Sequence, residues 1–118
     1  MSINCIRALI EKANRVCPDN IVIVDGQTRL SYAEVFKKVN QIARYFTELN
    51  LPSGSRIGIY SHKSSEQIIA ILAMLSTEYI FVPISRLLKP EQVQHIVNDC
   101  QIACIITDKA KIKSIDEI

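Results

Sequence analysis

Three short apolar segments, separated by two helical patterns, constrain the fold of this chain more than any other feature. They are RIGIY at 56–60, YIFVPI at 79–84 and IACII at 102–106. Their centres lie about 23 residues apart, the spacing of a βαβ unit in which a helix joins two parallel strands. None alternates cleanly between apolar and polar residues, as expected of parallel strands buried on both faces. The predicted order is therefore βαβαβ over 55–108, with right-handed crossovers.

Capping signals mark where the helices begin. Ser31 and Glu34 match a capping box, in which each side chain binds a free amide of the first turn. This pair predicts a helix over 31–50, and Pro52 and Gly54 are its stop signals.

Two further helices are predicted between the parallel strands. Ser64 and Gln67 precede a helix over 66–76 that is apolar on nearly every side, so it should be deeply buried. Pro90 suits the first position of the next helix, because proline lacks the amide that this position leaves unpaired. The last residues, TDKAKIKSIDEI, predict another helix or a tail.

The N-terminal part adds two elements to this pattern. Apolar residues at helical spacing predict a helix over 1–17, which Pro18 ends. Asp25-Gly26 lies between two apolar or β-branched runs and predicts a hairpin over 21–30. The expected fold class is α/β: an N-terminal helix and β-hairpin followed by a βαβαβ parallel-sheet (Rossmann-like) half-domain. The whole of 1–118 reads as a single subdomain.

Composition and charge narrow the functional classes. The 118 residues suffice for one domain with one core, and the net charge is only +2, with scattered basic residues. Nucleic-acid binding would favour a basic stripe, which is missing. No apolar run approaches the ~18 residues of a membrane span, and the N-terminus lacks the order of a secretory signal. We therefore expect a cytoplasmic protein.

Four cysteines raise a redox or metal hypothesis. They are Cys5, Cys17, Cys100 and Cys104. No C-x-x-C pair is present, and Cys100 and Cys104 fall at a helix end and within a strand, where they should point in different directions. Reduced, partly buried thiols are the favoured interpretation, and a small zinc or redox protein is the alternative.

Candidate ligand-binding residues follow the predicted parallel strands. His62 lies just after the first strand, while Arg86 and Lys89 lie between the second strand and the helix at Pro90. Ligands favour the carboxyl ends of strands in open α/β sheets, and helix N-termini favour anions. These residues could therefore contact an anion, or they could be loop residues kept for solubility. No glycine-rich phosphate loop and no nucleophile motif is present.

The ordered set of segments resembles the start of AMP-forming acyl-CoA synthetases and related adenylate-forming ligases. The resemblance is carried by PDNIVIVDGQTRLSYAEVFKKVNQIARYF, then GSRIGIYSHKSSEQIIAILAMLSTEYIFVPIS, then LLKPEQVQHIVNDCQIACIITD. It covers nearly the whole chain, and the last segment looks most like the acyl-CoA ligase branch. Two departures are Ser76–Tyr79, where the family usually has a glycine, and Pro83–Arg86, where many members have a P-L-[ND]-P sequence.

The resemblance implies a two-step ligase. A carboxylate attacks the α-phosphate of ATP and releases pyrophosphate, with magnesium offsetting the phosphate charge, and the thiol of coenzyme A or a carrier protein then takes the acyl group. The family's phosphate loop and catalytic lysine come later than this segment reaches, so no catalytic residue and no bound cofactor is expected here. Arg86, Lys89 and His62 become candidates for contact with coenzyme A or another anion.

Two partner hypotheses follow. The first partner is the remainder of the ligase chain, without which the fragment should be inactive, and an exposed sheet edge could also allow self-association. The alternative is a stand-alone, non-catalytic interaction module or split-enzyme partner derived from the same family.

Overall fold

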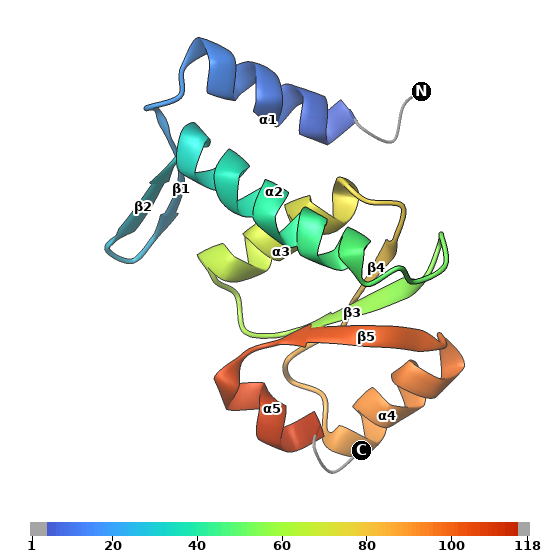
Figure 1. Ribbon diagram of the computed structural model, residues 1–118. Helices are drawn as coiled ribbons and strands as arrows, with labels where there is room; N and C mark the ends of the chain where they lie inside the picture. The colour runs from blue at the N-terminus through green and yellow to red at the C-terminus, as the bar shows by residue number, and fades with distance from the viewer. Residues whose placement is uncertain (1–4, 116–118) are drawn as a thin grey trace.

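The protein is described by a computed structural model that covers residues 5–115 (Figure 1). The predicted start of the first helix, 1–4, and the last residues, 116–118, lie outside the described part. The elements, in chain order, are α1 (Cys5–Val16), β1 (Ile21–Asp25), β2 (Thr28–Ser31), α2 (Tyr32–Glu48), β3 (Arg56–Tyr60), α3 (Ser65–Leu75), β4 (Ile80–Pro83), α4 (Pro90–Asp99), β5 (Ile102–Thr107) and α5 (Lys109–Ile115).

The parallel sheet has the strand order β4-β3-β5, so the first strand of the unit lies in the middle. Both neighbours run parallel to β3, and Ile57 is aligned with Phe81 on one side and with Cys104 on the other. Figure 1 shows α2 and α3 on one face of this sheet and α4 and α5 on the other. The α/β class and the predicted βαβαβ order are confirmed.

Two hydrophobic cores lie on the two faces of the sheet. Ile57 and Ile59 of β3 face the larger core, which is formed mainly with α2 and α3. Tyr60 is fully buried in the smaller core with Ile84 and Val93 of the β4–α4 segment. Alternate residues of β3 therefore serve opposite cores, as the pleat of a strand requires.

The capping box that begins α2 is present as predicted. The Ser31 Oγ accepts from the Glu34 N–H at 3.2 Å, and the Glu34 Oε1 accepts from the Ser31 N–H at 3.2 Å. At the other end, Asn50 has φ 55°, a left-handed conformation that asparagine tolerates and that ends the helix.

The hairpin turns at Gly26, whose φ of 62° suits a glycine. β1 and β2 pair antiparallel, with Asp25 opposite Thr28. The Asp25 Oδ2 also accepts from the Ser65 N–H at 2.9 Å, which ties the hairpin to the start of α3. This link between residues 40 positions apart has no signal in the local sequence pattern.

The expected burial of the strands and of the apolar helix was only partly correct. Only β3 is largely buried, whereas β4 and β5 are partly exposed because they form the two edges of a three-stranded sheet. α3 buries one face, and Ile68 on another face keeps 45% of its surface exposed. The prediction failed because periodicity shows which residues are apolar but not how many layers are present to cover them.

The exposed apolar residues of α1, β1 and α3 border a groove of about 670 Å³. Leu9 of α1 and Val24 of β1 are more than half exposed beside it. α1 therefore packs only part of its apolar face against α2 and α3.

The cysteines and the possibility of a metal site or a membrane span can be described for residues 5–115. Cys17, Cys100 and Cys104 are free and partly buried, and no group of three metal-ligating side chains occurs within residues 5–115. No helix in the same part of the chain is long and apolar enough to cross a membrane.

Replacing Ser31 by alanine tests the capping box. We expect Ser31→Ala to lower the free energy of unfolding by about 1 kcal/mol, because the first turn of α2 loses its side-chain acceptor. Urea denaturation measures this change. Ser53→Ala, at an exposed loop position, is the matched control and should change stability by less than about 0.5 kcal/mol. Equal effects of the two substitutions would contradict the role of the cap.

Candidate functional site

The carboxyl edge of the parallel sheet holds the main cluster of polar side chains that bridges distant segments. After β3 the chain enters α3 on one face of the sheet, whereas after β5 it enters α5 on the opposite face (Figure 1). Neighbouring strands whose following helices lie on opposite faces leave a crevice between their carboxyl ends. A cavity of about 460 Å³ occupies this position, between the loop at 61–64 and the start of α5.

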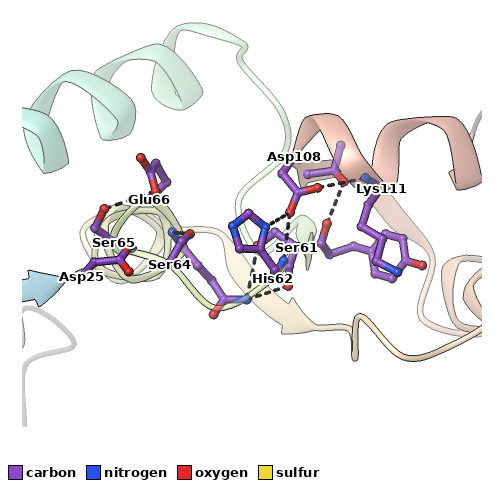
Figure 2. A network of polar contacts seen from close by, with 11 residues as sticks. Asp25, Ser61, His62, Ser64, Ser65, Glu66, Asp108 and Lys111 are labelled. Atoms are coloured by element: carbon purple, nitrogen blue, oxygen red, sulfur yellow. Dashed lines mark hydrogen bonds and ion pairs between the residues drawn. The ribbon is translucent and has the colours of Figure 1, made fainter. Parts of the chain in front are cut away.

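His62 and Asp108 are in direct contact at the wall of this crevice (Figure 2). The Asp108 Oδ2 accepts from the backbone N–H of His62 at 2.9 Å and lies 2.5 Å from the His62 Nδ1. The Asp108 Oδ1 accepts from the Lys111 N–H at 2.9 Å, so the same carboxylate caps the start of α5. One aspartate thus joins the β3–α3 loop to the helix that follows β5.

The contacts lower the pKa of Asp108 to about 2. The backbone N–H of His62 has the largest effect, followed by the His62 side chain, since both interactions favour the charged carboxylate. An ionised carboxylate only accepts hydrogen bonds, so the adjacent Nδ1 must carry a proton. In the neutral imidazole the lone pair then lies on Nε2, on the ring edge opposite the Nδ1–H.

The rest of the crevice is lined by small polar groups and by apolar side chains. The Gln67 Nε2 donates to the Ser61 carbonyl at 3.2 Å, and the Gln67 N–H donates to the Ser64 Oγ at 3.2 Å. Ile106 and Ala110 contribute apolar surface. These contacts fix the loop at 61–64 against α3, so that the imidazole lies between Asp108 and Ser64 (Figure 2).

Tyr60, the last residue of β3, is buried below the carboxyl edge of the sheet and binds the segments that follow β4 and β5. Its carbonyl accepts from the Thr107 Oγ1 at 2.7 Å, and its hydroxyl donates to the Leu88 carbonyl at 3.2 Å. The Lys111 ammonium lies 5.5 Å from the centre of the Tyr60 ring. The three segments that leave β3, β4 and β5 are therefore connected through one buried tyrosine.

The structure places Arg86 and Lys89 apart from this cluster. Both side chains are exposed, and neither lines the crevice at His62. Within residues 5–115 neither side chain forms a hydrogen bond or an ion pair, while the Lys89 N–H donates to the Gln92 Oε1 at 2.9 Å at the start of α4. The three predicted residues thus share the carboxyl side of the sheet but form no common site, and their proposed ligand contacts stay predictions.

Sequence reasoning identified His62 but missed Asp108 as its partner. Thr107 and Asp108 are the last two residues of the third segment quoted for the family resemblance, and neither was singled out there. The position of Asp108 directly after a parallel strand was the available signal, because the carboxyl ends of neighbouring parallel strands meet at one edge of the sheet.

The lowered pKa of Asp108 gives a prediction for acid conditions. Because the pKa in the folded protein is below the unfolded value of 3.8, the ionised carboxylate stabilises the fold above about pH 4, and this contribution is lost as pH falls towards 2. An NMR titration of the side-chain carboxyl carbon measures the pKa. His62→Ala should raise it only partway, since the backbone N–H remains, and His95→Ala on α4 should leave it unchanged. An ordinary pKa in the unmodified protein would contradict the geometry.

Comparison with known proteins relates this fold to one family. The model of the AMP-binding enzyme family matches residues 10–118. Tyrocidine synthase 1 of Brevibacillus parabrevis is 36% identical over 105 residues, which cover 89% of this chain and 10% of the relative. Gramicidin S synthase 1 of Brevibacillus brevis is 34% identical over 113 residues, which cover 96% of this chain and 10% of the relative. The chain thus spans about a tenth of the length of these curated relatives.

Solved structures show the same fold in ligases of two kinds. An anthranilate CoA ligase bound to anthranoyl-AMP superposes with a TM-score of 0.88 at 19% identity, covering 100% of this chain and 24% of that one. A nonribosomal peptide synthetase structure gives a TM-score of 0.85 at 21% identity, covering 94% and 12%. The comparisons therefore do not favour the acyl-CoA ligase branch, which the sequence suggested, over the peptide synthetases. Since the family model matches nearly the whole sequence, this chain belongs to the AMP-binding enzyme family.

Proposed function

We propose that this chain is the N-terminal part of an AMP-forming acid–thiol ligase. The longer protein would activate a carboxylic acid with ATP to an acyl-adenylate and transfer the acyl group to coenzyme A or to a carrier-protein thiol. The observation that supports this proposal is the family match over residues 10–118 on a chain with the corresponding α/β topology. We further propose a cytoplasmic location.

The proposal assigns the chemistry to the remainder of the longer protein. Within residues 5–115 no group of three metal-ligating side chains occurs. The sequence also lacks a glycine-rich phosphate loop. In this proposal the segment supplies one half-domain of the scaffold, and no step of adenylation is assigned to its residues.

The partly exposed edges of the sheet support a requirement for further chain. β5 is a six-residue edge strand without proline, and within residues 5–115 no strand pairs with its outer side, as edge pairing with another strand requires. We propose that a later strand of the same ligase pairs there. Self-association through this edge is the alternative when the segment is alone.

A stand-alone, non-catalytic interaction module or split-enzyme partner is the second candidate function. The described fold is consistent with it, because both cores are formed within the segment. The nucleotide sequence after the codon for Ile118 distinguishes the two. An open frame continuing into a serine-, threonine- and glycine-rich loop favours the ligase, and a stop codon favours the module.

The ligase proposal predicts that the 118-residue chain alone is inactive. Incubation with ATP, magnesium and a panel of fatty, aromatic and amino acids should release no pyrophosphate above background, because the sequence has no glycine-rich phosphate loop to hold ATP. Pyrophosphate release is the measurement, and a longer polypeptide that includes the following domains is the positive control. Turnover by the short chain would contradict the assignment of chemistry to the remainder.

Arg86 and Lys89 are proposed to contact the phosphates of coenzyme A. The support is that both cations are exposed beside the N-terminus of α4, where the helix dipole favours an anion. Arg86→Ala combined with Lys89→Ala in the longer enzyme should raise the KM for coenzyme A about tenfold and leave the adenylation step unchanged. Arg44→Ala, at an exposed position of α2, is the control. An unchanged KM for coenzyme A would show that these two residues do not contact it.

A further inference from the structure

The crevice between the ends of β3 and β5 has the position and the size of a ligand site. It lies where helices leave neighbouring strands for opposite faces of the sheet, which is where open α/β sheets bind ligands. Its volume of about 460 Å³ falls within the range of small-molecule sites. The crevice is separate from the exposed loop that carries Arg86 and Lys89, so an inference about it does not depend on the proposed function.

The His62 Nε2 is an unused hydrogen-bond acceptor at this crevice. Asp108 keeps the proton on Nδ1, as described above, and no group within residues 5–115 donates to Nε2. The side chain is 58% exposed, so a ligand can reach it, whereas the Asp108 side chain is only 19% exposed. When the imidazole is neutral, the aspartate fixes it in one tautomer and one orientation.

Two serine hydroxyls at the crevice can donate hydrogen bonds, whereas the His62 Nε2 accepts one. The Ser61 and Ser64 Oγ atoms each accept a hydrogen bond from Gln67, at 3.3 and 3.2 Å. A hydroxyl that accepts still has its own proton to donate. The crevice thus offers an acceptor on the imidazole and donors on the loop, beside the apolar surface of Ile106 and Ala110.

The charges around the crevice disfavour the anionic ligand that the sequence suggested for His62, and favour a neutral ligand instead. Asp108 and Glu66 are both among the lining residues, and Lys109 is the one lysine that lines it. An anion would also meet the lone pair of Nε2, and a carboxylate has no proton to donate to it. A neutral molecule with an N–H group avoids both penalties.

We propose that this crevice binds a small neutral aromatic primary amide, whose N–H donates to the His62 Nε2. The ligand's own acceptor faces the hydroxyls of Ser61 and Ser64, and its ring lies against Ile106 and Ala110. Asp108 is a positioning residue, since it fixes the tautomer of His62 without contacting the ligand.

Benzamide and benzoate form a matched pair of probes for this proposal. They have nearly the same shape, but only benzamide is neutral and has an N–H donor. ¹⁵N-labelled protein at about pH 8.5 is titrated with each probe, and the ¹⁵N shifts of the His62 ring show that the imidazole is neutral. We expect benzamide to bind with a dissociation constant on the order of 1 mM, and to shift the His62 Nε2 and the amides of Ser61 and Thr107. Benzoate should bind at least about tenfold more weakly, the effect of losing one hydrogen bond.

Two histidine variants separate the site from non-specific binding. His62→Phe keeps a planar ring but removes the acceptor, and should weaken benzamide about tenfold. His95→Phe, on the exposed side of α4, is the control and should leave binding unchanged. If His62→Phe does not fold, the shift of Nε2 in the unmodified protein decides the question. Equal binding of benzoate, an unmoved Nε2, or shifts confined to the groove beside α1 would each overturn the proposal.

Discussion

The pairing of β3 with a parallel strand on each side is the constraint on which the remaining structure depends. This central strand is shared by both cores: Ile57 and Ile59 pack beneath α2 and α3, and Tyr60 packs against α4 and its preceding loop. Gly58 lies between them, and a Cβ there would come within 3.0 Å of the Ile84 Cδ1. On the face that Gly58 shares with Tyr60, the missing side chain of the glycine lets Ile84 approach the backbone of β3.

The same strand order creates the candidate site. Because β3 is first in sequence and central in space, the chain must leave it towards one face and return across it on the other. The loop after β3 and the loop after β5 are consequently neighbours at a crevice, although 46 residues separate His62 from Asp108. The imidazole of His62 contacts Asp108, the residue that caps the N-terminus of α5. One carboxylate thus stabilises the start of α5 and orients the histidine at the same time.

The exposed apolar surface agrees with membership of a family of much longer proteins. The groove beside α1 and the two partly exposed edge strands lie on different parts of the molecule. Burial of apolar area is the main stabilising term in folding, so surface left uncovered here represents stabilisation that further layers could still supply. The chain spans about a tenth of the length of the curated relatives, and in the function proposed above these surfaces would face the remainder of the longer protein.

Sequence alone determined the features that depend on residues close together in the chain. The capping box of Ser31 and Glu34, the turn at Gly26 and the order of helices and strands follow from local propensity and short-range hydrogen bonds, and the structure shows all of them. Tertiary structure decided the rest. The exposure of Ile68, the separation of His62 from Arg86 and Lys89, and the pairing of His62 with Asp108 depend on which elements meet and how many layers cover them. Periodicity carries no information about those distances, because it reports a residue's direction from its own helix or strand and not the neighbour it will face.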